Sequence, residues 1–191
     1  PGLVEFSDLG GNSPVYLHDW DSDLIAVTNS RIYRVNKSGV QTDVTGVPVS
    51  GYGRPVFGKT VDELLIAAGG PLIRLSGSAT EQLSVDAPNS THVAFIDGYV
   101  LAIQIDTGLF EHSDVDASRT WSGLDTFAAN GKPDNLTGLL ITPFREIILS
   151  GPDSVEQFER LPQGSTPFFR RWALGEGIIA PYAMVAEDSG V

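Results

Sequence analysis

YVLAIQI-DTG-LFEHS, residues 99–113, is the stretch from which the fold of this chain is most readily worked out. β-branched, aromatic and other apolar residues fill both flanks, and three residues that favour turns separate them. This arrangement is typical of a β-hairpin. We therefore predict two antiparallel strands, Tyr99–Ile105 and Leu109–Ser113, joined by a tight turn at Thr107 and Gly108.

The same pattern occurs three more times along the chain. The other copies are Asp23–Asn29 with Arg31–Lys37, Glu63–Ala68 with Pro71–Ser76, and Arg145–Ser150 with Ser154–Glu159. Their predicted turns lie at Ser30, at Gly69 and Gly70, and at Pro152 and Asp153. Corresponding positions in the four hairpins are spaced by 40, 37 and 46 residues; they are Ile32, Leu72, Leu109 and Val155.

Each hairpin is flanked by further strand-like segments, which makes a unit of four strands. The predicted first strands are Val15–Trp20, Pro55–Gly58, His92–Ile96 and Leu136–Thr142. The predicted outer strands are Gln41–Val44, Glu81–Val85, a strand near Trp121, and Phe168–Trp172. Four short strands repeated about every 40 residues are typical of a propeller blade. We predict an all-β fold, a partial β-propeller of about four four-stranded antiparallel blades.

The expected blades span residues 14–49, 50–90, 91–131 and 136–175, and residues 177–191 are expected to start a further blade. Gly177–Val185 (GIIAPYAMV) resembles a first strand without the rest of its unit. The chain also begins with Pro1 rather than methionine. We therefore expect a piece of a longer protein, whose other blades lie outside this sequence or are replaced by contacts between subunits.

The amino-acid composition disfavours several kinds of partner and site. The formal net charge is −12, with 24 acidic and 12 basic residues, which disfavours tight binding to a phosphate backbone. Cysteine is absent, so neither disulfides nor thiolate metal sites can form. No apolar run is long enough for a transmembrane helix, and no signal peptide is recognisable, so no membrane association is expected.

One segment matches a nucleotide-binding pattern. Gly53–Thr60 (GRPVFGKT) satisfies the P-loop spacing G-x-x-x-x-G-K-[ST], in which backbone amides hold phosphate at the start of a helix. However, Pro55 removes one amide donor, and Gly69 and Gly70 follow too soon for the P-loop helix. We expect a strand and a turn, and a P-loop NTPase is kept only as an alternative.

Other candidate sites are weaker. Alternating carboxylates from Asp19 to Asp23 resemble part of a calcium loop, although Leu24 occupies the position of the usual glycine. The histidines, His18, His92 and His112, have no metal-ligand spacing, and the last two fall in predicted strands. No catalytic residue, cofactor or metal ligand is predicted, although a propeller glycosidase and a generic propeller interaction module remain alternatives.

Residues 1–177 resemble the packaged-DNA stabilisation proteins of short-tailed phages. The resemblance begins at Pro1-Gly2-Leu3 and continues through Phe95–Val100. It is clearest at Trp121 with Phe127–Asn135 and then at Ile148–Phe158, and it ends with Pro167–Arg170 followed by Gly177–Ala180. These elements occur in the family's order. The matching residues that we single out as structural are Pro133, Asp134, Gly151, Ser154, Glu156, Pro167, Phe168, Arg170 and Gly177.

The resemblance implies a structural virion protein, not an enzyme. Such proteins assemble in the bacterial host cytoplasm and occupy the virion tail or the head–tail connector. There a ring of copies contacts the portal protein and the tail needle or other tail proteins. The ring closes the portal channel and retains the packaged DNA until ejection. A prophage could encode the same protein.

Overall fold

A computed structural model describes residues 5–10, 15–49, 53–161 and 166–185 of the chain. Within these residues every regular element is a β-strand, and no helix occurs. Sixteen strands form four separate antiparallel sheets, and in each sheet the four strands follow the order of the sequence. This is the expected all-β architecture, and the sheets are called blades 1 to 4 below.

The strands lie close to the predicted positions in all four repeats. Blade 1 contains β1 (Tyr16–Trp20), β2 (Asp23–Val27), β3 (Ile32–Val35) and β4 (Gln41–Asp43). Blade 2 contains β5 (Val56–Lys59), β6 (Leu64–Ala67), β7 (Ile73–Ser76) and β8 (Ala79–Gln82). Blade 3 contains β9 (Ser90–Ile96), β10 (Tyr99–Gln104), β11 (Leu109–Asp114) and β12 (Ala117–Ala128). Blade 4 contains β13 (Gly138–Ile141), β14 (Glu146–Ser150), β15 (Val155–Arg160) and β16 (Phe168–Leu174).

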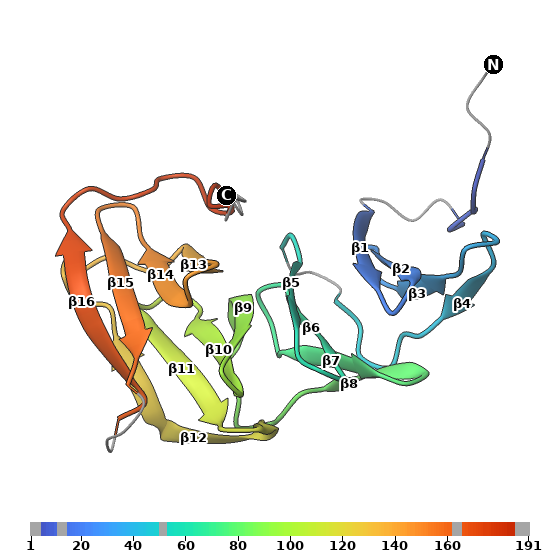
Figure 1. Cartoon of the computed structure of the whole chain (residues 1–191). Helices are drawn as coiled ribbons and strands as arrows, with labels where there is room; N and C mark the ends of the chain where they lie inside the picture. Colours follow the sequence, from blue (N-terminus) through green and yellow to red (C-terminus); the bar gives the residue numbers. More distant parts are fainter. Residues whose placement is uncertain (1–4, 11–14, 50–52, 162–165, 186–191) are drawn as a thin grey trace.

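The four blades follow one another along an arc that does not close (Figure 1). The first strands of the blades, β1, β5, β9 and β13, lie on the concave side of this arc, and the last strands lie on its outer side. An open arc of radial four-stranded sheets is part of a β-propeller. The concave side therefore corresponds to the axis of the propeller.

Three apolar clusters hold the blades together, one at each junction. Blades 1 and 2 share a cluster that includes Ile25 and Ile66, and blades 2 and 3 share one that includes Leu65 and Val100. Because side chains alternate between the two faces of a strand, consecutive residues such as Leu65 and Ile66 pack against different neighbours. Both faces of blades 2 and 3 are therefore buried, since each of these blades contributes to two clusters.

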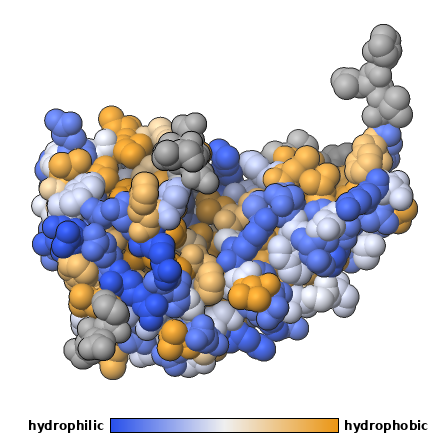
Figure 2. Space-filling model, in the orientation of Figure 1, coloured by the Kyte–Doolittle hydropathy of each residue, from blue (hydrophilic) through white to orange (hydrophobic). Residues whose placement is uncertain are grey.

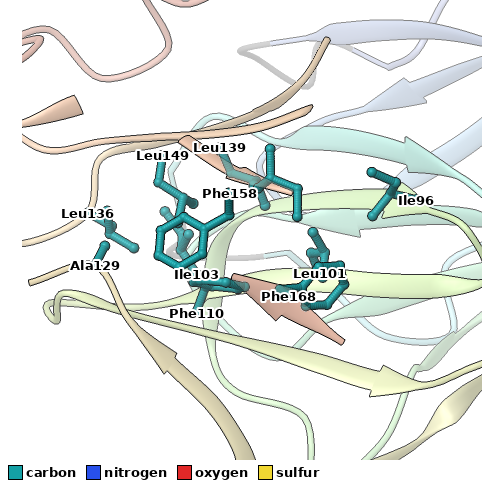
Figure 3. Packing of buried hydrophobic residues seen from close by; sticks show 11 residues of the cluster. Ile96, Leu101, Ile103, Phe110, Ala129, Leu136, Leu139, Leu149, Phe158 and Phe168 are labelled. Carbon is teal, nitrogen blue, oxygen red and sulfur yellow. The ribbon is translucent and has the colours of Figure 1, made fainter. Parts of the chain in front are cut away.

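The junction between blades 3 and 4 has an aromatic centre (Figure 3). Phe110 on β11 is fully buried, and its ring centroid lies 5.1 Å from that of Phe158 and 5.2 Å from that of Phe127. Phe168 from β16 completes the group. Such ring pairs add to the stabilisation that comes from the apolar area they bury.

The end of the described chain differs from the prediction. No strand forms within residues 177–185, where we expected the first strand of another blade. Pro181 interrupts the segment, and Tyr182 has a positive φ of 64°, which is incompatible with an extended strand. The segment instead lies over the concave side of the arc (Figure 1).

Candidate functional site at the propeller axis

A cavity of about 450 Å³ opens on the concave side of the arc. All four first strands contribute to its lining, together with residues of the C-terminal segment. Because β1, β5, β9 and β13 each lie at the edge of their sheet, they present backbone groups that no strand of their own blade pairs. Ligand sites are preferentially concave, so this axial cavity is the candidate functional site.

Aromatic stacking organises the side chains of the cavity. His18 on β1 stacks on Phe57 of β5, with 4.5 Å between the ring centroids and 6° between the planes. His92 on β9 stacks on Tyr182 of the C-terminal segment at 5.0 Å. The guanidinium of Arg54 lies 5.5 Å from the Tyr182 centroid, in the geometry of a cation–π contact.

Burial governs the protonation of both imidazoles. It lowers the pKa of His92 to about 4, and His92 is only 5% exposed. Burial also lowers the pKa of His18, and the positive charge of Lys59 adds to this effect. Both rings are therefore neutral at pH 7. The His18 Nε2 atom is buried without a hydrogen-bond partner.

Gly53–Thr60 does not form a P-loop. Residues 56–59 are strand β5, and the next element is strand β6, where a P-loop requires a helix. Thr60 instead closes the turn between these strands, because its Oγ1 accepts a hydrogen bond from the Glu63 amide at 3.0 Å. The Lys59 ammonium pairs with Asp19 at 3.2 Å. The P-loop alternative is therefore wrong for this segment.

The carboxylates of Asp19, Asp21 and Asp23, which resembled part of a calcium loop, form ion pairs with basic side chains. Arg34 bridges Asp23, at 2.6 Å, and Asp21, at 2.9 Å. Among the described residues, no group of three acidic or histidine side chains has the arrangement of a metal site. His92 and His112 lie in β9 and β11, as expected, and both are buried.

Several residues of the phage-like motif meet at the turn between β14 and β15. The Asp134 carboxylate accepts hydrogen bonds from the Asp153 amide at 2.8 Å and from the Ser154 hydroxyl at 2.9 Å. A Cβ atom at Gly151 would collide with this carboxylate. Asp134 therefore ties the connection between blades 3 and 4 to the hairpin of blade 4, and Gly151 leaves room for it. Pro133 is exposed in the same connection.

A second group of motif residues surrounds a buried carboxylate. Glu156 is 1% exposed, and its Oε1 accepts the Gly131 amide at 2.6 Å. Its Oε2 accepts a bond from Arg170 at 3.2 Å, and Arg170 also donates to the Asn130 side chain at 2.8 Å. A buried charge is tolerated only when it is paired and hydrogen-bonded in this way. These contacts fasten the same connection to β15 and β16.

The remaining motif residues lie around blade 4. Phe168 belongs to the aromatic centre of the core, and the Pro167 carbonyl accepts the Leu161 amide at 2.8 Å. Gly177 packs so closely on Gly151 and Pro152 that any Cβ atom would collide with their backbone. The matching residues Pro1-Gly2-Leu3 lie outside the described residues.

Sequence reasoning missed the aromatic residues of the axis. Tyr182 lies 90 positions from His92, and Arg54 was considered only as part of the P-loop pattern. His18, Phe57 and His92 meet at the axis because they lie on first strands, so the strand order within each repeat is a usable signal for them. Arg54 and Tyr182 lie outside the described strands, so the repeat pattern does not mark them.

Basic side chains are mostly neutralised within the chain. Eight of the twelve pair with carboxylates, namely Arg31, Arg34, Lys59, Arg74, Arg145, Arg160, Arg170 and Arg171. Hydrophilic and hydrophobic residues are intermixed over the face shown in Figure 2. In the described part of the chain, no helix is long and apolar enough to cross a bilayer.

The radial sheets and their axial cavity define the class of this protein, a β-propeller. The chain belongs to the family described as bacteriophage P22 Gp10, β-propeller, whose sequence pattern matches residues 1–190. This match supports a structural role in a phage particle and confirms the resemblance found in the sequence. No curated protein sequence matches the chain at a significant level.

Solved structures of other proteins are similar in fold. The computationally designed Ika8 protein aligns with a TM-score of 0.63 and 12% identity, over 91% of this chain and 54% of that one. A streptogramin B lyase aligns with a TM-score of 0.63 and 10% identity, over 87% of this chain and 57% of that one. Hsv2 of Kluyveromyces lactis aligns with a TM-score of 0.51 and 11% identity, over 76% of this chain and 48% of that one.

At these identities the similarity shows the fold alone, and it transfers no activity to this chain. The chain spans little more than half of the length of the first two structures.

Proposed function

We propose that this chain is the propeller of a phage tail or head–tail connector protein that closes the portal channel and retains packaged DNA. The observation that carries the proposal is the family match over residues 1–190. In this role, a ring of copies contacts the portal protein on one side and the tail needle or another tail protein on the other. The chain acts by occupying space and binding neighbours, without catalysis.

The charge distribution supports this role. A protein that retains DNA by closing a channel needs no affinity for the phosphate backbone, and tight binding would hinder ejection. Tight DNA binding needs unpaired lysines and arginines that release counterions. Here the net charge is −12, and eight of twelve basic side chains already pair with carboxylates.

We further propose that the propeller continues beyond blade 4 and that residues from Gly177 onwards lead into another blade. A recurring hydrogen bond supports this. At the start of blade 3, the Ser90 amide donates a hydrogen bond to the Gly70 carbonyl at 2.9 Å. Just before blade 4, the Leu136 amide donates to the Thr107 carbonyl at 2.7 Å. After blade 4, the Ile178 amide donates to Gly151 at 2.9 Å in the same way. All three acceptors lie in the central hairpin turn of the preceding blade.

The free face of blade 4 supports the same conclusion. Trp172 pairs with Gln157 and Leu174 pairs with Val155, so these side chains share the face that points away from blade 3. Trp172 is 40% exposed and Leu174 is 55% exposed. On the corresponding face of blade 3, Phe110 is fully buried by blade 4. A further blade would cover the exposed side chains in the same manner.

DNA retention can be measured directly in phage particles. We expect heads assembled without this protein to package DNA and then lose it, so that their DNA becomes sensitive to added nuclease. Supplying the protein from a plasmid should restore nuclease resistance. Particles that keep their DNA protected in the absence of the protein would refute the retention role, even if the protein is a component of the tail.

A further inference from the structure

The axial cavity differs in charge from the rest of the chain. The sequence has two acidic residues for each basic one, yet the ionisable side chains that line the cavity are Arg54, Lys59, His18, His92 and Tyr182. No carboxylate belongs to the described lining. Lys59 reaches out of the cavity to Asp19, so that pair adds little net charge. Arg54 therefore supplies most of the positive charge.

Arg54 differs from most other arginines of the chain because no carboxylate among the described residues pairs with it. Its contact is with the face of the Tyr182 ring, at 5.5 Å. The Arg54 guanidinium thus lies over the Tyr182 ring, and its N–H groups can still donate hydrogen bonds to an anion.

Two further polar groups border the same cavity. The His18 ring belongs to the lining, but its Nε2 atom is buried and so does not face a ligand in the cavity. Ser150 also belongs to the lining. Arg54 suits a ligand that has acceptor oxygens, and Phe57 and Met184 in the wall suit a ligand that also has an apolar body.

We propose that the axial cavity binds a carboxylate-bearing, extended peptide segment of a partner protein. An arginine binds a carboxylate through two parallel hydrogen bonds. The free edges of the first strands can pair with an extended peptide backbone, as in β-strand addition. A nucleic acid has no backbone amides for such pairing, so the edges favour a peptide. This inference does not depend on the role in DNA retention.

The test uses a hexaglutamate peptide and isothermal titration calorimetry at low salt. We expect saturable binding that weakens by about tenfold or more in Arg54→Gln, since a charge-assisted bidentate contact is lost. Arg119→Gln is the matched control, because Arg119 is exposed on the outer strand β12 and should leave the affinity unchanged. Thermal unfolding of both variants verifies that each is folded.

The proposal would be overturned by the absence of saturable hexaglutamate binding, by an equal loss of affinity in Arg119→Gln, or by tighter binding of a thymidine hexanucleotide than of the peptide. Inorganic phosphate is titrated as well. If phosphate binds as tightly as the peptide, the cavity is a general anion site and the peptide assignment is wrong.

Discussion

Replacing Phe110 by alanine is expected to lower the free energy of unfolding by about 3–5 kcal/mol, because the change opens a cavity at the centre of the aromatic cluster. Phe110 is fully buried and contacts rings from three other strands of blades 3 and 4. Urea unfolding followed by tryptophan fluorescence at pH 7 measures the effect. The expected result is a large shift of the midpoint with a similar slope.

Phe144→Ala is the matched control for this measurement. Phe144 lies at the turn between β13 and β14 and is 81% exposed, so its removal should change the free energy of unfolding by less than about 0.5 kcal/mol. Equal effects of the two substitutions would contradict the assignment of Phe110 to the junction between blades 3 and 4.

Acid is expected to destabilise the protein through His92. The pKa of this imidazole is about 4 in the folded state, against an ordinary value of 6.5, because burial disfavours the charged ring. Between pH 6.5 and pH 4 the unfolded chain therefore binds more protons than the folded one. The stability contributed by His92 is complete above pH 6.5 and decreases by about 2–3 kcal/mol on going to pH 4.5.

The measurement compares urea unfolding at pH 7 and pH 4.5 for the parent chain and His92→Gln. Other groups titrate in this range; burial raises the pKa of Glu111, so that acid favours the folded state at that position. The difference between the two proteins isolates His92. The parent should lose about 2–3 kcal/mol more than the variant on acidification. Parallel losses would show that His92 is accessible and titrates normally in the folded state.

The strands of this protein could be predicted from the sequence because local signals mark them. Apolar runs bounded by Gly, Asn, Asp or Pro recur with nearly constant spacing, and each of the sixteen strands predicted within the four repeats has a counterpart in the structure. The structure of the segment from Gly177 was harder to predict, because its composition is that of a β-strand although residues 177–185 form none. Whether an extended segment becomes a strand depends on a partner, and no strand among the described residues pairs with residues 177–185.

The contacts of the site could not be predicted in the same way. Asp134 and Ser154 are separated by 20 residues, and nothing in either sequence neighbourhood shows that they meet. The same holds for Tyr182 and His92 at the axis. The resemblance to a known family identified the motif residues as a set. The hydrogen bonds between them are visible only in the structure, which brings the connection between blades 3 and 4 beside the β14–β15 turn.

Binding to the portal ring tests the central claim most directly. The protein as the phage encodes it is mixed with purified portal rings, and multi-angle light scattering measures the mass of the complex, with duplex DNA titrated in parallel at physiological salt. The proposed function predicts a complex of defined mass, in which a ring of copies is attached to the portal, and no tight binding of DNA. A protein that stays monomeric and does not bind the portal, or that binds DNA with sub-micromolar affinity, would contradict the role in closing the channel.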